Sequence, residues 1–176
     1  TTSRNLMTAS MVTLRPTQEM YIKHRKELTD PWVGTGASRH REMIERLAHE
    51  LIDEWIDDES VEFISQFARP LPQRVFASIL GFPFEDIPQL AQWGDAVVTP
   101  FVHGTGLKHE LAPDQASEMF RRLEGFQDYI YEQVRAKRVN PQDDMVSFLC
   151  DVHYQPLDRK LTDLEIAGIV HAMIIG

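Results

Sequence analysis

Apolar residues recur at intervals of three and four along most of this chain, and this spacing predicts amphipathic helices rather than strands. Met43, Leu47 and Leu51 follow it in one segment, and Phe126 and Ile130 follow it in another. Prolines, glycines and acidic clusters separate the periodic segments. We therefore predict an all-α protein, with helices over residues 16–28, 38–56, 75–80, 83–97, 115–138 and 143–152 and from 161 onward.

The segments between these helices are predicted to be short connections with no convincing strand. Gly34 and Gly36 mark a turn, and Gly81 is expected to end its helix as a left-handed cap. The remaining connections are loops at 1–14 and 99–113, a short extended link at 61–64 and a turn at 153–160.

The segment from Leu161 to Gly176 carries the strongest helix signal. Thr162 and Glu165 have the spacing of a capping box, which satisfies backbone N–H groups left free in a first helical turn. From Ile166 the segment is apolar almost all round, as expected for a helix buried in a large protein. Because natural termini are usually polar and exposed, we predict that the chain is part of a longer protein, cut inside a central helix.

Size and composition favour one soluble domain. The 176 residues are 43% hydrophobic and 26% charged, which is ordinary for a globular protein. No apolar run approaches the roughly 18 residues that span a bilayer, and no signal peptide opens the sequence. The single cysteine, Cys150, excludes an internal disulfide and fits a reducing compartment. These features predict a cytoplasmic location.

Charge is unevenly distributed. The formal net charge is −9, which argues against a nucleic-acid partner. Residues 1–46 nevertheless hold eight Lys/Arg against five Asp/Glu, with a cluster at Lys23, Arg25, Lys26, Arg39, Arg41 and Arg46. Two interpretations stay open: a solvated helix face, or a docking patch for an acidic protein or for anionic groups of a cofactor.

The residues alone reveal no recognisable catalytic or metal site. No His or Cys pair has the spacing of a zinc site, and no phosphate loop or nucleophile elbow is found. Cys150 is interpreted as a buried structural thiol. His171, the one ionisable residue of the apolar run, is either a hydrogen-bonded core histidine or a residue that faces a ligand. Carboxylate pairs such as Asp143-Asp144 lie at predicted helix starts or ends, where solvation and the helix dipole explain them.

Three segments together resemble bacterial cytochromes P450, and the camphor-hydroxylating members are a similar subgroup. Residues 69–88, RPLPQRVFASILGFPFEDIP, resemble the family's PLPxxVxxxxLGxPxED stretch. Residues 161–176 resemble the entry to its central helix, written LTDxEIxG before an apolar run, and DDMVSFL at 143–149 matches the preceding DDxxSxL helix. The resemblance covers the chain from about residue 14.

The resemblance implies the helical, amino-terminal to central portion of a P450 fold. A single partial domain over 1–176 would then comprise a loop (1–14), the first helices (15–98), a loop resembling the lid over the substrate channel (99–113), and later helices with the start of the central helix (114–176).

The resemblance also implies a cofactor site. Aligning Trp32 with the family's usual aromatic residue places Tyr21 and Arg25 at the positions of the HxxxR pair, which holds a haem propionate. A guanidinium can bind a carboxylate through two parallel hydrogen bonds. Tyr21 departs from the usual histidine but retains one hydroxyl donor.

Other functional positions follow from the same match. Ala172, Ile175 and Gly176 fall where the central helix forms the substrate-facing wall. Lys23 and Lys26 lie on the helix that, in the family, faces a ferredoxin- or flavodoxin-type redox partner.

The implied parent protein is a haem-thiolate monooxygenase that inserts one oxygen atom from O2 into a small apolar substrate. The family's Gly-x-(Asp/Glu)-Thr, ExxR and iron-binding cysteine are not in this sequence, and Cys150 precedes the central helix without a glycine-rich surround. The chain alone is therefore not expected to oxygenate a substrate. The alternative is a catalytically inactive helical binding or assembly module derived from a P450, with its exposed half-helix covered by a partner or a second copy.

Overall fold

The computed structural model describes residues 14–103 and 111–175, and these residues are almost entirely helical. The sheet in this part of the chain is one antiparallel hairpin, in which β1 (His153–Tyr154) pairs with β2 (Arg159–Lys160). The all-α prediction is therefore confirmed, with a small hairpin where a turn was expected. The predicted loop at 1–14 lies outside the described residues, except for Leu14, which is fully buried.

The longer helices agree with the periodic segments of the sequence. In chain order they are α2 (Gln18–His24), α3 (Arg41–Asp53), α4 (Pro70–Leu80), α5 (Ile87–His103), α6 (Pro113–Val139), α7 (Met145–Asp151) and α8 (Asp163–Ile175). Shorter helical turns connect them, of π type at Arg25–Thr29 and Ile64–Ala68 and of 3-10 type at Gly34–His40, Phe84–Asp86 and Gln155–Leu157.

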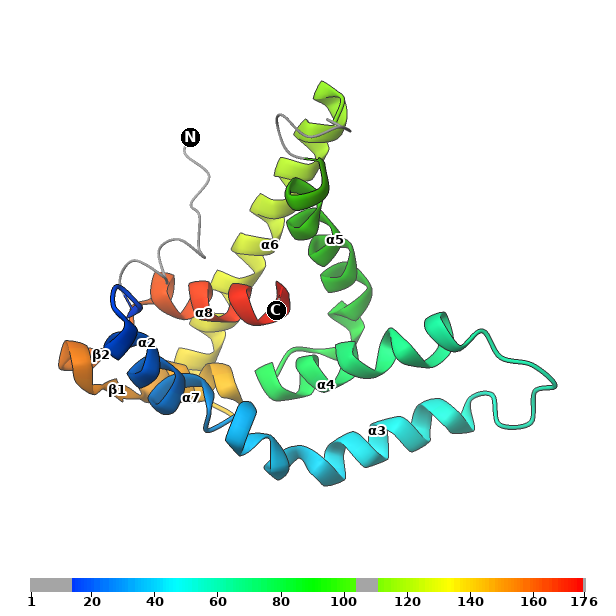
Figure 1. Cartoon of the computed structure of the whole chain (residues 1–176), viewed down its shortest axis with the longest axis horizontal. Coiled ribbons are helices and arrows are strands. Elements are labelled where there is room, and N and C mark those ends of the chain that lie inside the picture. The colour runs from blue at the N-terminus through cyan, green and yellow to red at the C-terminus, as the bar shows by residue number, and fades with distance from the viewer. Residues whose placement is uncertain (1–13, 104–110, 176) are drawn as a thin grey trace.

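Figure 1 shows the helices as two long pairs that meet at a central helix. Helices α3 and α4 lie side by side and are joined by a long connection at one end of the molecule. Helices α5 and α6 form the second pair, and α8 crosses α6 near the middle of the molecule. Helix α2, the hairpin and α7 gather at the end opposite the α3–α4 connection. In the described ranges, no helix combines the length and the apolar character needed to cross a lipid bilayer.

The core is centred on α6 and α8. Helix α6 buries Phe126, Ile130 and Val134 on one side, as its periodicity predicts, and α8 buries an almost continuous run that includes Ile166 and Val170. Each such side chain contributes about 1.5–3 kcal/mol when fully buried. The expectation that the apolar segment forms a buried central helix is confirmed.

Two predicted helix ends are also confirmed. Gly81 ends α4 with φ of 72°, a left-handed conformation that favours glycine, and a Cβ atom there would overlap the carboxylate of Asp144. At the start of α8, the Thr162 N–H donates to Glu165 Oε2 at 2.8 Å and the Glu165 N–H donates to Thr162 Oγ1 at 3.3 Å. This reciprocal pair is the expected capping box.

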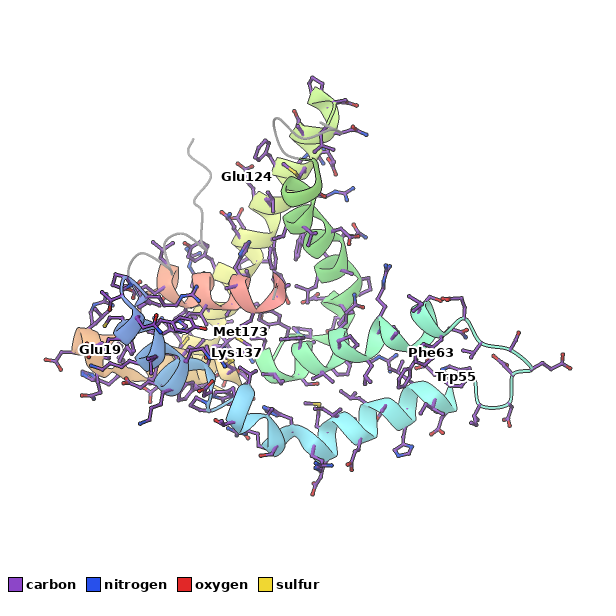
Figure 2. The ribbon with its side chains drawn as sticks, in the orientation of Figure 1. Glu19, Trp55, Phe63, Glu124, Lys137 and Met173 are labelled. Carbon is purple, nitrogen blue, oxygen red and sulfur yellow. The ribbon has the colours of Figure 1, made fainter. Side chains whose placement is uncertain are left out.

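The predicted extended link at 61–64 is wrong, because Ile64 begins a π-helical turn. Glu62 explains the difference. Its carboxylate accepts from the N–H groups of Ile64 at 3.3 Å and Ser65 at 2.7 Å, so it satisfies donors that would otherwise be free at the start of that turn. The apolar side chains of this segment remain exposed, with Phe63 52% accessible, and Figure 2 shows Phe63 near Trp55 at the end of the α3–α4 pair.

The two predicted boundaries around glycines and prolines also differ from the structure. Residues 34–40 form a 3-10 turn rather than a simple bend, with Gly34 at φ of 64°. Helix α5 continues through Pro100 to His103, so the expected loop at 99–113 is shorter, and residues 104–110 lie outside the described ranges. A proline removes one backbone hydrogen bond, yet α5 includes Pro100 and packs along α6.

The Asp143-Asp144 pair was attributed to solvation and dipole effects at a helix end; Asp144 does lie at the start of α7 as its N-cap, but its side chain is buried rather than solvated. Asp144 is 3% exposed; its Oδ1 accepts from the Ser147 N–H at 2.7 Å, and its Oδ2 accepts from Lys137 Nζ at 2.5 Å. Asp144 therefore caps α7 and at the same time pairs with the end of α6. Only Asp143 matches the solvated interpretation, with a side chain that is largely exposed.

Candidate functional site

A cavity of about 190 Å³ lies between α2 with its following π turn on one side and α8 on the other. Both predicted cofactor residues, Tyr21 and Arg25, line it together with the predicted substrate residue Ala172. The other lining residues are Arg15, His24, Thr29, Val33, Ile169 and Met173. The structure thus brings two separately predicted sites to one place.

Local helix geometry places the α2 side chains in this cavity. Thr17 caps α2 by accepting from the Met20 N–H at 3.2 Å, so the helix begins at Gln18, two residues after the proline expected to open it. Residues three and four positions apart share a helix face, and Tyr21 and Arg25 have this spacing. The same geometry adds His24, which sequence analysis had treated as isolated.

Arg25 is partly available to a ligand. Its Nη2 donates to Asp30 Oδ1 at 3.1 Å, and about half of its side chain is exposed. One carboxylate therefore uses only part of a guanidinium that has five N–H donors. Tyr21 is 44% exposed and lies at the rim of the cavity rather than in its interior.

His24 and Arg15 are the cavity residues that sequence analysis missed. His24 is 4% exposed, and neither ring nitrogen has a hydrogen-bond partner; the Nε of Arg15 is also buried without one. Burial and then the nearby charges of Arg15 and Arg25 lower the pKa of His24 to about 4, so its imidazole is neutral at pH 7. The sequence signal was the position of His24 three residues after Tyr21.

The predicted docking lysines lie on α2 outside the cavity. Lys23 pairs with Glu19 at 2.8 Å along the helix, and both side chains are exposed. This exposed pair raises the pKa of Lys23 and lowers that of Glu19. Lys26 is exposed on the following turn. Both positive charges are therefore accessible to a partner from solvent.

Of the predicted α8 residues, only Ala172 can be placed in the cavity. Ile175 ends α8, but its side chain lies outside what the structure describes, as does the whole of Gly176. Ile174 instead faces a second cavity of about 320 Å³, which is lined mainly by apolar residues of α4 and α5. Figure 2 labels Met173, which lines the cavity with Ala172, beside the end of α8.

His171 is a core residue, but it is not hydrogen-bonded at Nδ1 as the core interpretation expected. It is 8% exposed, its ring lies 5.4 Å from that of Phe126, and its Nδ1 is buried without a partner. Burial lowers its pKa. Because the ring packs on α6, His171 does not line the cavity that contains Ala172.

The start of α8 is held by charged contacts. Arg159 donates to both carboxylate oxygens of Glu165 at 2.8 Å, and Arg138 donates to the Leu161 carbonyl at 2.8 Å and to Asp163 at 2.6 Å. These contacts fix the end of α8 that leads to Ala172. Within residues 14–103 and 111–175, no group of three His, Cys, Asp or Glu side chains is arranged to hold a metal ion.

Comparison with known proteins identifies relatives in one family, although no family model matches the chain. The polyketide biosynthesis cytochrome P450 PksS of Bacillus subtilis (strain 168) is 30% identical over 136 residues, which cover 77% of this chain and 30% of that protein. The 6-deoxyerythronolide B hydroxylase of Saccharopolyspora erythraea is 23% identical over 173 residues, or 98% of this chain and 39% of that enzyme.

Solved structures share the fold. PksS matches with a TM-score of 0.77 at 22% identity, covering 99% of this chain and 41% of the PksS chain. P450BioI, solved in complex with an acyl carrier protein ligated to hexadec-9Z-enoic acid, matches with a TM-score of 0.75 at 24% identity, covering 99% of this chain and 43% of its own. This chain is a homologue of the cytochromes P450. It spans about a third of the length of the curated relatives, at 30% and 39% for the two above.

Cytochromes P450 bind haem through a cysteine thiolate, and Cys150 does not match that ligand in this P450 homologue. It lies in α7 with 6% exposure, and its Sγ is 3.7 Å from the Val134 carbonyl oxygen. Burial raises the pKa of the thiol, so the thiolate is disfavoured. The interpretation of Cys150 as a buried structural thiol is confirmed.

The cavity between α2 and α8 fits the carboxylate side chain of a haem. Its lining includes buried polar atoms without hydrogen-bond partners, namely the Nε of Arg15 and the two ring nitrogens of neutral His24, one a donor and one an acceptor, and it also includes Arg25. No Asp or Glu is among its lining residues. A carboxylate would satisfy the donors among these groups, and the apolar side of the cavity on α8 suits a hydrocarbon arm.

Proposed function

We propose that this chain forms the distal wall and carboxylate-binding part of a haem-thiolate monooxygenase. The reaction is the insertion of one oxygen atom from O2 into a small apolar substrate, with electrons supplied by a redox partner. The observation that carries the proposal is the shared cavity, which joins Tyr21 of α2 and Arg25 of the following π turn to Ala172 of α8. The cytochrome P450 relatives, among them a hydroxylase, support the same reaction class.

Arg25 would hold a haem propionate, because its guanidinium keeps donors free beyond its contact with Asp30. Asp30 fixes the orientation of the guanidinium, and Tyr21 adds a hydroxyl donor at the rim. When bound, haem supplies the oxygen-activation chemistry that amino-acid side chains cannot perform. The contribution of this chain is to bind the cofactor carboxylate and to exclude water with the apolar face of α8.

The substrate would contact α8 at Ala172 and, by continuation of the helix, at Ile175 and Gly176. Residues 99–103 at the end of α5 and the start of α6 would belong to the lid over the substrate channel, and residues 104–110 of the predicted lid loop lie outside the described residues. An acyl chain presented by an acyl carrier protein is one form of apolar substrate consistent with the relatives, since P450BioI was solved with such a carrier.

Electrons would arrive from a ferredoxin- or flavodoxin-type protein that docks at Lys23 and Lys26. Both lysines are exposed on one surface of α2 and its following turn, and they attract an acidic partner at low salt. The proposed cellular location is the cytoplasm.

The proposal is tested by the visible absorption spectrum of the protein in its natural form. The protein is purified after expression with ample haem, reduced and exposed to carbon monoxide. Where a cysteine outside this sequence supplies the thiolate, the expected result is the Soret band of thiolate-ligated haem, and its loss when the Arg25→Ala substitution weakens cofactor retention; this chain by itself should not show that band. A protein that takes up no haem under these conditions contradicts the proposal.

The second candidate function is a catalytically inactive helical binding or assembly module. One observation favours it: Ile56, Phe63 and Ile64 are more than half exposed at the end of the α3–α4 pair, where they form an apolar surface. Sedimentation velocity tests this candidate. A complex or dimer that dissociates on Phe63→Ser substitution supports it, whereas a folded monomer without a bound partner argues against it.

A further inference from the structure

The His24 ring is a buried polar group with no partner in the described structure. A buried donor or acceptor without a hydrogen bond is costly, and in native proteins each such group needs an explanation. His24 is 4% exposed, and both Nδ1 and Nε2 lack partners. The Nε of its neighbour Arg15 is also buried without a hydrogen-bond partner. Two such residues around one cavity indicate a ligand rather than two separate packing faults.

The charge of the cavity specifies the ligand. Arg15 and Arg25 both lie close enough to His24 to lower its pKa, and the lining includes no carboxylate. The neutral imidazole offers one N–H donor, and the guanidinium groups offer several more. A group with two acceptor oxygens and a negative charge complements this set, as a carboxylate does.

The volume of the cavity, and the apolar lining that α8 provides across from His24, restrict the ligand further. The volume of about 190 Å³ is several times the roughly 30 Å³ that one water occupies in the liquid, so the cavity can take a carboxylate with a short hydrocarbon arm. Ile169, Ala172 and Met173 of α8 provide the apolar surface for that arm.

We propose that His24 and Arg15 bind the cofactor carboxylate together with Arg25, and that His24 rather than Tyr21 is its buried hydrogen-bond donor. The proposal rests on the proposed function, because the carboxylate is taken to be a haem propionate. The exposures of the two side chains favour this assignment: Tyr21 is 44% exposed and therefore accessible to water, whereas His24 is 4% exposed and lines the cavity. Desolvation makes a hydrogen bond to a charged oxygen stronger at His24 than at Tyr21.

Equilibrium binding of two porphyrins tests the proposal without any activity assay. Metal-free protoporphyrin IX has two free carboxylates, and its dimethyl ester has none. Fluorescence titration should show that His24→Leu weakens binding of protoporphyrin IX about tenfold or more and leaves binding of the ester unchanged. Tyr21→Phe should weaken binding of protoporphyrin IX less than His24→Leu does, because the Tyr21 hydroxyl lies at the exposed rim. His153→Leu is the matched control, because His153 is exposed on the hairpin and pairs with Asp158.

A second measurement separates this proposal from the proposed function. Two-dimensional NMR of the histidine rings during titration with sodium propionate should shift the His24 signals and leave the His153 signals unchanged. If propionate shifts His24 but no porphyrin binds, the carboxylate site stands and the haem function fails. If porphyrin binds equally to wild type and His24→Leu, and propionate leaves His24 unchanged, the role of His24 is overturned while the haem function stands. If neither probe has an effect, both proposals are overturned.

Discussion

Arg159 and Glu165 form two parallel hydrogen bonds, each of 2.8 Å, that join the β-hairpin to the first turn of α8. Glu165 is 3% exposed, and the same carboxylate accepts from the backbone and the hydroxyl of Thr162. Burial opposes ionisation of Glu165, but the hydrogen bonds from Arg159 and Thr162 outweigh it and lower the pKa of this carboxyl. One side chain therefore caps the central helix and fixes its approach to the cavity.

Substitution of Arg159 by Met should destabilise the fold by about 2–4 kcal/mol, because it leaves a buried carboxylate without its charged partner. Urea unfolding at pH 7 measures the effect. The double substitution Arg159→Met with Glu165→Gln should recover part of the loss, since the uncompensated charge is then removed. A single variant as stable as wild type would show that Thr162 alone compensates the carboxylate.

Two ion pairs, one buried and one exposed, allow a direct comparison: Lys137 with Asp144, and Lys160 with Asp151. The side chains of the first pair are 12% and 3% exposed, whereas those of Lys160 and Asp151 are 57% and 86% exposed. Lys137→Met should cost about 3–5 kcal/mol, because Asp144 remains buried and charged. Lys160→Met should cost less than about 1 kcal/mol, as is typical of surface pairs. Chemical denaturation of both variants checks the contrast, and equal losses would contradict the assigned burial.

Acid should destabilise the protein through His24. The pKa of this ring is about 4 in the folded chain and near 6.5 when unfolded. Between these values the unfolded state binds the proton and the folded state does not, so stability is full above pH 6.5 and falls as the pH drops toward 4. The loss amounts to about 3 kcal/mol, from about 1.4 kcal/mol per pH unit.

His24→Leu should remove this part of the acid sensitivity and raise stability at pH 7 by about 1 kcal/mol, because the substitution replaces an unpartnered polar ring by an apolar side chain. Urea midpoints measured from pH 4 to pH 8 for wild type and variant provide the test. Parallel pH profiles would mean that His24 finds hydrogen-bond partners or water in solution.

Cys150 should react slowly in the folded protein. Its pKa is raised by burial, and the thiol lies against the Val134 carbonyl, so little thiolate reaches the solvent. Alkylation with iodoacetamide at pH 8, followed by mass spectrometry, should become at least about a hundredfold faster once urea unfolds the chain, the factor expected if reaction needs an opening that costs about 3 kcal/mol. Rapid labelling in buffer alone would show that α7 opens readily.

The helices were predictable because their signals are local. Apolar spacing, proline at a first turn and glycine at a last one act within a few residues, which is why α6, α8 and the end of α4 agree with the sequence prediction, although α4 begins at Pro70 rather than Val75. Errors occurred where a side chain replaced the expected backbone pattern. Glu62 caps a π turn at a segment that looked extended, and α5 continues through Pro100 where a loop was expected.

The candidate site was only partly predictable. The resemblance to P450 motifs selected Tyr21, Arg25 and Ala172, and all three line one cavity. It did not select His24 or Arg15, because a motif assigns roles only to the positions it contains. The spacing of three between Tyr21 and His24 shows that they share a helix face, but not how deeply each is buried.

The amino-acid sequence by itself determined the helical class, the limits of most helices, the cap of α8 and the family relationship, since each depends on residues close together in the chain. Tertiary structure alone decided which α2 side chain is buried, that Asp144 meets Lys137 and that His171 packs on Phe126. These outcomes depend on which helix faces which, and contact between distant segments sets the burial and charge that each side chain experiences.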